Sequence, residues 1–299
     1  MEHNHLYVQT GEGVRLFVRK LGHGVDTVII PNAIYMEEDF ERLSHTHTVI
    51  LFDLRNRGRS DAVDDPAQLA RGIEHDVDDI EAVRSHFGVE NFALIGHSYV
   101  GLVVALYAMR HPAQLSRVVQ ISPAQPVFGQ QYPAELCCLD GVLSEVSGEL
   151  QALQALRQSF EAVEFCRQWW AIARRMFVAD PALMDQFRNW GFCDLPNERN
   201  FMRHWIQNIS PSLQRLVLNA EDFARAACPV LTVHGTKDRN APYGGGVEWA
   251  RRLPNAKLLT IDGAGHLPWV EAPAVFWEAV DSFLAQPPQP WLASFPEVS

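Results

Sequence analysis

Three residues that lie far apart in the chain have the types that nucleophilic catalysis requires: Ser98, Asp238 and His266. A serine hydroxyl becomes a good nucleophile when a base removes its proton. A histidine can do this near neutral pH, because its ordinary pKa is about 6.5. A carboxylate beside the imidazole orients it and stabilises the imidazolium that forms. In the chain order Ser, Asp, His, these residues predict acyl transfer through a covalent acyl-enzyme, provided that the fold brings them together.

The sequence around Ser98 favours this role. An apolar run over residues 92–95 is followed by Gly96-His97-Ser98 and then by a helical pattern. A strand that turns sharply into a helix exposes the residue at the turn, beside backbone N–H groups of the first helical turn. Without its partners, the Gly-x-Ser motif is a weak signal, because a Ser N-cap on a buried helix explains it as well. We expect the neighbouring His97 to pack or form a local hydrogen bond.

Asp238 and His266 lie in loops that each follow a predicted strand. Open α/β sheets place their sites at the carboxyl ends of strands, so both loops are expected at the same edge as Ser98. Asp262 is an alternative acid, but it lies only four residues before His266, at the end of the same strand, which makes its reach awkward. We therefore expect Asp238 to hold the histidine.

The pattern of apolar residues predicts the elements that position these loops. Runs typical of strands buried on both faces occur at 27–30, 48–52, 92–95, 115–121, 229–233 and 256–261. Apolar residues at helical spacing predict helices at 73–87, 247–253 and 276–284. Alternating residues around positions 10–13 predict an antiparallel hairpin at the start. The fold class is therefore α/β, with a mostly parallel central sheet and helices on both faces.

The stretch from about 124 to 225 has a different texture. It contains no convincing buried strand and is rich in Trp and Phe at helical spacing, with Gly and Pro as breaks. We predict one core domain made of residues 1–123 and 226–299, interrupted by an all-helical cap at 124–225.

Over nearly all of its length the chain resembles the α/β-hydrolase superfamily. The matching segments are Gly96-His97-Ser98-Tyr99, Asp53 to Ser60, Gly235-x-x-Asp238 and Gly263-x-Gly265-His266-x-Pro268. The resemblance implies the α/β-hydrolase fold, a cap after the sixth strand, and an oxyanion hole formed by the backbone N–H groups of Tyr99 and Ala33. We expect charged residues of the Asp53 loop, Arg57 among them, to fix that loop near the site.

Two departures from the superfamily pattern affect the oxyanion hole. Val100 stands where the second Gly of Gly-x-Ser-x-Gly is usual, with Gly101 one place later, and its β-branched side chain is expected to crowd the helix against the sheet. Pro31-Asn32 replaces the usual His-Gly. Proline lacks a backbone donor, and the side-chain amide of Asn32 is an alternative one.

The composition limits the partners. A net charge of −11 without a basic cluster argues against nucleic acid or an anionic membrane surface. No apolar run approaches the roughly 18 residues of a membrane span, and the N-terminus has no signal peptide pattern. Five cysteines at spacings that match no zinc site predict reduced thiols. We expect a cytoplasmic monomer or homodimer with no metal or other cofactor.

The aromatic insertion indicates the substrate. Side chains such as Trp169 and Trp205 predict an apolar pocket, and hence a small or medium, mainly apolar carboxylic ester. An aminopeptidase resembling proline iminopeptidases is the first alternative, with Glu161 or Glu164 binding a free α-amine. A lactonase or a carbon–carbon bond hydrolase fits the same three residues. A ligand-binding protein of this fold with low turnover is a rival of another class.

Overall fold

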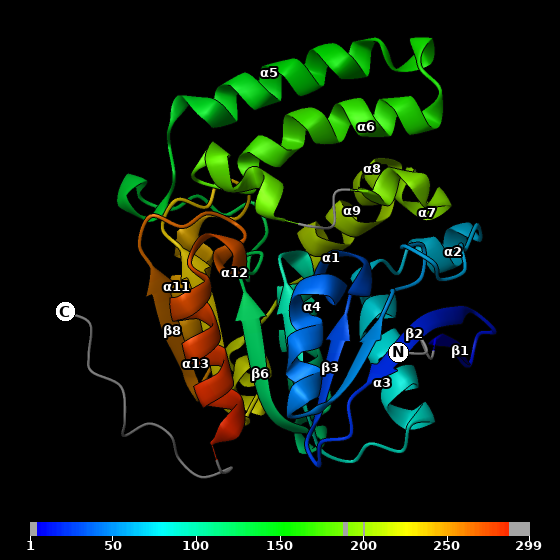
Figure 1. The fold of residues 1–299 in the computed structure, drawn as a ribbon, viewed down its shortest axis with the longest axis vertical. Coiled ribbons are helices and arrows are strands. Elements are labelled where there is room, and N and C mark those ends of the chain that lie inside the picture. The colour runs from blue at the N-terminus through cyan, green and yellow to red at the C-terminus, as the bar shows by residue number, and fades with distance from the viewer. Residues whose placement is uncertain (1–4, 188–190, 200, 287–299) are drawn as a thin grey trace.

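The computed structural model describes residues 5–187, 191–199 and 201–286 of the chain. In that part, eight strands form one sheet in the order β1-β2-β4-β3-β5-β6-β7-β8 (Figure 1). The strands are β1 (His5–Gln9), β2 (Arg15–Leu21), β3 (Thr27–Pro31), β4 (Thr48–Phe52), β5 (Phe92–His97), β6 (Leu115–Ile121), β7 (Val230–Gly235) and β8 (Ala256–Ile261). β2 pairs antiparallel with both β1 and β4, and the other neighbours are parallel. The predicted fold class is confirmed.

The central strands are mainly apolar because both of their faces are buried in hydrophobic cores. Along β3, Val28 and Ile30 belong to one hydrophobic core and Ile29 to the other, as the period of two requires. The first core includes residues of α1 (Ala33–Phe40), α12 (Pro268–Glu271) and α13 (Pro273–Ala285). The second includes residues of α3 (Ile73–His86), α4 (Tyr99–Arg110) and α11 (Tyr243–Arg252). Helices therefore cover both faces, with the short α2 (Pro66–Leu69) outside them.

Between β6 and β7 the described residues form helices and irregular segments but no strand. We call residues 124–225 the helical insertion. Its α-helices are α5 (Gly141–Ala155), α6 (Ala162–Ala173), α7 (Pro196–Arg199), α8 (Phe201–His204), α9 (Ser210–Arg215) and α10 (Ala220–Arg225), and a π-turn covers Trp205–Ile209. Figure 1 shows α5 and α6 above the end of the sheet at which β6 and β8 terminate. The insertion therefore lies over the edge where the candidate catalytic loops emerge.

The prediction of five reduced thiols is wrong for two of them. Cys166 of α6 and Cys193, in the turn Gly191–Asp194, form a disulfide, whereas Cys137, Cys138 and Cys228 are free. Both bridged residues are buried, because α6 packs against that turn inside the insertion. Since disulfides are rare in reducing compartments, the cysteines no longer support a cytoplasmic location. None of the helices in the described part of the chain has the length and apolar character that a membrane span needs.

Candidate active site

Ser98 occupies a sharp turn between β5 and α4. Its backbone has φ 60° and ψ −131°, a region that residues other than glycine rarely adopt. Hydrogen bonds hold it there: its N–H donates to the carbonyl of Ile121 at 2.9 Å, and its own carbonyl accepts from Gly101 at 2.9 Å and Ala124 at 3.0 Å. The half-buried side chain therefore projects from a turn that the neighbouring strand and helix fix in place.

The close approach of helix and sheet at this turn falls on glycines. A Cβ atom at Gly96 would lie 2.5 Å from the carbonyl oxygen of Val100, and one at Gly101 would lie 3.0 Å from Cβ of Pro123. The side chain of Val100 is fully buried in the core on the α4 side of the sheet. The displaced Gly101 thus lies at a close approach to Pro123, and Gly96 lies at a close approach to the backbone of Val100.

Asp238 and His266 form a buried pair. Nδ1 of His266 lies 2.8 Å from Oδ2 of Asp238, and both side chains are fully buried. The same oxygen lies 3.1 Å from Nε2 of His234, while Oδ1 accepts backbone N–H groups from Asn240 and Ala241, each at 2.8 Å. Burial opposes ionisation, but the two imidazoles outweigh it and hold the pKa of this carboxyl well below its usual range. Asp238 is therefore ionised and His266 is oriented by it.

The other ring nitrogen of His266 makes no hydrogen bond with the described residues. This nitrogen, Nε2, is buried. The ring packs edge-on against Phe177, with centroids 5.3 Å apart, and lies 4.5 Å from the ring of His97.

Asp262, the alternative acid, instead accepts a hydrogen bond from Thr236 at 2.9 Å on the exposed surface. The structure thus favours Asp238 as the partner of the imidazole.

His97 supports the histidine loop rather than reacting. Its Nε2 lies 2.9 Å from the backbone carbonyl of His266, which can only accept, so this nitrogen carries a proton. Burial, followed by the nearby His266, lowers the pKa of His97 well below its ordinary value. The ring is therefore neutral and ties the residue before Ser98 to the loop of His266.

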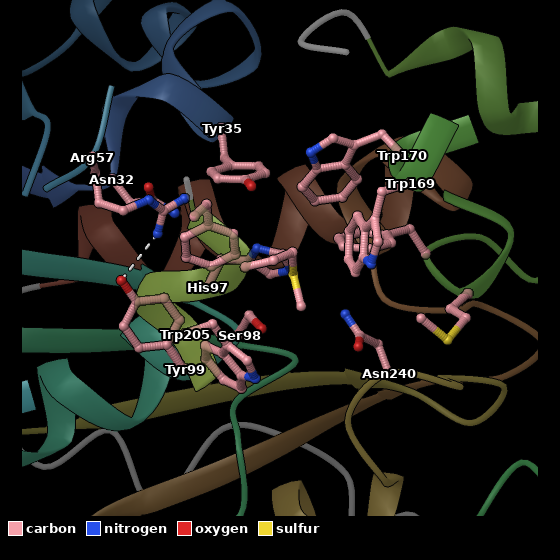
Figure 2. Close-up of a pocket in the computed structure, with 14 residues that line it drawn as sticks. Asn32, Tyr35, Arg57, His97, Ser98, Tyr99, Trp169, Trp170, Trp205 and Asn240 are labelled. Atoms are coloured by element: carbon pink, nitrogen blue, oxygen red, sulfur yellow. Dashed lines mark hydrogen bonds between the residues drawn. The ribbon is translucent and has the colours of Figure 1, made fainter. Parts of the chain in front are cut away.

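Ser98 lines a cavity of about 260 Å³ beneath the helical insertion (Figure 2). The other lining residues are Asn32, Tyr35, Arg57, His97, Tyr99, Trp169, Trp170, Met176, Phe177, Phe201, Met202, Trp205 and Asn240. Trp169 and Trp205, both predicted to bind substrate, are among them. Glu161 and Glu164 are not: Glu161 is exposed just before α6, and Glu164 accepts from Gln168 at 2.9 Å on the surface. The wall of the cavity is mainly aromatic.

The candidate oxyanion donors lie at two helix starts. Tyr99 begins α4, and Ala33 begins α1 directly after Asn32, whose backbone is left-handed at φ 74°. Asp53 fixes the start of α1, because its Oδ1 accepts the N–H of Ile34 at 2.8 Å. The side chain of Asn32 lines the cavity, and its Oδ1 is buried with no partner in the described part of the chain. Asn32 therefore lies in the wall of the cavity with one unsatisfied polar atom.

A buried ion pair lies beside the cavity, and only one of its two partners was predicted from the sequence. Arg57 binds both carboxylate oxygens of Glu198, at 2.9 and 3.2 Å, and donates to the hydroxyl of Tyr99 at 3.1 Å. Its guanidinium also stacks 3.9 Å from the ring centre of Phe201. The prediction that Arg57 fixes its loop agrees with these contacts. Glu198 had no signal, because it lies 141 residues away on a short helix of the insertion.

Comparisons with known proteins agree with the fold. A family model described as the alpha/beta hydrolase fold matches residues 33–273. The chain is 25% identical to the AB hydrolase superfamily protein YisY of Bacillus subtilis, covering 94% of this chain and 97% of that protein. It is 28% identical to a non-heme chloroperoxidase of Streptomyces lividans, over 87% and 92% of the two chains. An esterase structure from Exiguobacterium antarcticum superimposes with a TM-score of 0.70 at 20% identity, over 94% and 99% of the chains.

Proposed function

Because the chain belongs to the alpha/beta hydrolase fold family, we propose that it is a serine hydrolase that cleaves a small or medium, mainly apolar carboxylic ester. In this mechanism Oγ of Ser98 attacks the ester carbonyl carbon while Nε2 of His266 takes its proton. The tetrahedral intermediate collapses to an acyl-enzyme, and His266 passes the proton to the departing alcohol. Water then attacks the acyl-enzyme, with His266 as the base. The bond from the acyl carbon to Oγ of Ser98 breaks, His266 returns the proton to Oγ, and the acid leaves.

One observation carries the proposal. The imidazole of His266 is fixed through Nδ1 to an ionised carboxylate, while its buried Nε2 has no partner among the described residues. A buried nitrogen without a partner is costly unless a group arrives to use it. The hydroxyl of Ser98, on the residue after the His97 that contacts His266, is the group that we assign to it.

The oxyanion that forms on the substrate needs donors. We assign these to the backbone N–H groups of Tyr99 and Ala33, which begin helices and so lie at the positive end of a helix dipole. The side-chain amide of Asn32 serves as a further donor when it turns its nitrogen toward the cavity. In this proposal residues 124–225 act as the cap, and residues 1–123 with 226–299 form the core domain.

The lining of the cavity supports a neutral apolar substrate. Most of it is aromatic, and the charge of Arg57 is compensated by the buried Glu198. A free α-amine would need an unpaired carboxylate, and neither Glu161 nor Glu164 lines the cavity, so the aminopeptidase alternative has less support. A lactone or an activated carbon–carbon bond would meet the same nucleophile, and both belong in the substrate panel.

A fluorophosphonate probe and a substrate panel test the proposal together. We expect the probe to label the folded wild-type protein and to leave Ser98→Ala unlabelled, since the probe needs the activated hydroxyl. In the panel, p-nitrophenyl esters from acetate to octanoate are compared with proline p-nitroanilide, a lactone and a vinylogous diketone. Absence of both labelling and turnover by folded wild-type protein contradicts the proposal and favours a ligand-binding protein.

A further inference from the structure

Glu271 links the helical insertion to the loop of the catalytic histidine. It is the last residue of α12, five positions after His266. Its Oε1 accepts the backbone N–H of Gly265 at 2.8 Å, and its Oε2 accepts the backbone N–H of Ala179 at 2.7 Å. One carboxylate therefore joins the residue immediately before His266 to a residue of the insertion.

Further contacts dock the same insertion segment, residues 177–179, on this loop. The backbone N–H of His266 donates to the carbonyl of Phe177 at 2.9 Å, and the ring of Phe177 packs against the imidazole. Arg239, next to Asp238, donates to the carbonyl of Val178 at 2.6 Å. Segment 177–179 therefore contacts the backbone of His266, its ring, and the residue next to its carboxylate partner Asp238.

Segment 177–179 and the histidine loop approach too closely for a side chain at position 265. A Cβ atom at Gly265 would lie 2.8 Å from the backbone nitrogen of Ala179 and 2.9 Å from Oε1 of Glu271. Only a glycine fits between the carboxylate and the insertion at this point. A shift of the insertion would therefore move the backbone on which His266 is carried.

The ionised form of Glu271 is the better acceptor of both amides, because a protonated carboxyl carries an O–H on one of its two oxygens, yet burial disfavours the charge. Burial, with a further contribution from the charge of Asp238, raises the pKa of Glu271 to about 7. A carboxylate kept in such surroundings is unfavourable for stability alone, which points to a role in the site.

We propose that Glu271 is a positioning residue: its carboxylate holds segment 177–179 against the histidine loop, so that the imidazole is correctly placed for Ser98 only when the insertion is docked. This inference rests on the proposed function. It assigns to the insertion a part in catalysis besides the lining of the pocket.

The test compares Glu271→Gln, Glu271→Asp and the matched control Glu278→Gln, which changes an exposed glutamate on α13. The oxygen of a glutamine can accept one of the two N–H groups. Its NH₂ group is a donor and cannot accept the other N–H, so that hydrogen bond is lost. We expect Glu271→Gln to lower kcat for a p-nitrophenyl ester and the rate of fluorophosphonate labelling by about 100-fold, with KM almost unchanged, because the substrate pocket is intact. Glu271→Asp keeps both acceptor oxygens on a shorter stem and should fall between wild type and Glu271→Gln.

A second measurement does not depend on turnover. The measurement is the NMR resonance of the Nδ1 proton that His266 shares with Asp238, assigned by its loss in Asp238→Asn. We expect it to shift or broaden in Glu271→Gln but not in Glu278→Gln.

A folded Glu271→Gln protein with wild-type labelling rate and an unchanged resonance overturns the proposal, as does a rise in KM at constant kcat. If Glu271→Gln does not fold, Glu271→Asp decides: slower labelling supports the proposal and unchanged labelling overturns it. If wild-type protein is neither labelled nor active, the proposed function fails, and the resonance alone decides the role of Glu271.

Discussion

At the scale of single residues, the carboxylate of Asp238 has little freedom to rotate. One oxygen accepts two backbone amides, and the other lies between the imidazoles of His266 and His234. Nε2 of His234 also lies 3.1 Å from the carbonyl of Ala241, so this nitrogen carries a proton and donates to both acceptors. His234 therefore orients the carboxylate that holds the imidazole of His266.

Replacing His234 tests this chain of hydrogen bonds. We expect His234→Phe to lower kcat at least about 10-fold, because a hydrogen bond to a charged group contributes roughly 1.5–3 kcal/mol and here fixes the carboxylate. His234→Gln restores a side-chain donor and should recover part of the rate. Both rates are measured with the best ester of the panel, alongside thermal unfolding. Equal rates for folded His234→Phe and wild type would show that the other donors of Asp238 suffice.

At the scale of elements, the ion pair of Arg57 and Glu198 joins the loop after β4 to α7 of the helical insertion. Both side chains are almost fully buried. The N–H of Gly58 also donates to Glu198, at 2.8 Å, so the carboxylate binds the loop through backbone as well as side chain. Removing one partner leaves an uncompensated buried charge, whereas removing both does not.

We therefore expect Glu198→Ala to lower the free energy of unfolding by about 3–5 kcal/mol. The double variant Arg57→Met/Glu198→Met should recover much of that loss, because no buried charge remains without a partner. Urea unfolding of wild type, Arg57→Met, Glu198→Met and the double variant gives the coupling energy of the pair, and Glu198→Ala is measured beside them. If Glu198→Ala lowers the free energy of unfolding by less than about 1 kcal/mol, water reaches Arg57 and the ion pair is accessible to solvent.

The contrast between these elements explains what the sequence could predict. The buried strands were predictable because runs such as Val28-Ile29-Ile30 reflect packing on both faces, which is a local and periodic requirement. Asp238 and His266 followed from their place at strand ends. Glu198 and Glu271 had no comparable signal, because their partners depend on how irregular segments of the insertion dock on the core. The Cys166–Cys193 bridge had none either, because it depends on how α6 packs against an irregular turn inside the insertion.

At the scale of the whole molecule, the site belongs to neither the sheet nor the insertion alone. The sheet supplies Ser98 and the Asp238–His266 pair at one edge, and the insertion supplies most of the aromatic wall over it. Glu271 and the Arg57–Glu198 pair fasten the two parts at different points around the cavity. Charged groups buried at or near this junction make the stability of the whole fold depend on pH.

Asp76 shows this dependence most directly. It lies on α3 with Asp79, and both are buried; Asp79 pairs with Arg55 at 2.6 Å, whereas Oδ2 of Asp76 has no partner in the described part of the chain. Burial, followed by the charge of Asp79, raises the pKa of Asp76 to about 8, although Arg57 and Arg55 oppose the rise. An aspartate in the unfolded chain titrates near 3.9. Between about pH 4 and pH 8, therefore, the native state holds a proton that the unfolded state has lost.

Because the native state binds the extra proton, the contribution of Asp76 to the free energy of unfolding is complete below about pH 4. It decreases as the pH rises toward 8, by up to about 1.4 kcal/mol per pH unit. Asp76→Asn cannot ionise, so its stability relative to wild type should increase steadily from pH 5 to pH 8. Urea unfolding at several pH values measures this difference, and Asp78→Asn, on the exposed side of α3, is the control that should leave the slope unchanged. Parallel curves for wild type and Asp76→Asn would place an ionised Asp76 in the native state, and the charges of Arg55 and Arg57 would then have to outweigh the cost of its burial.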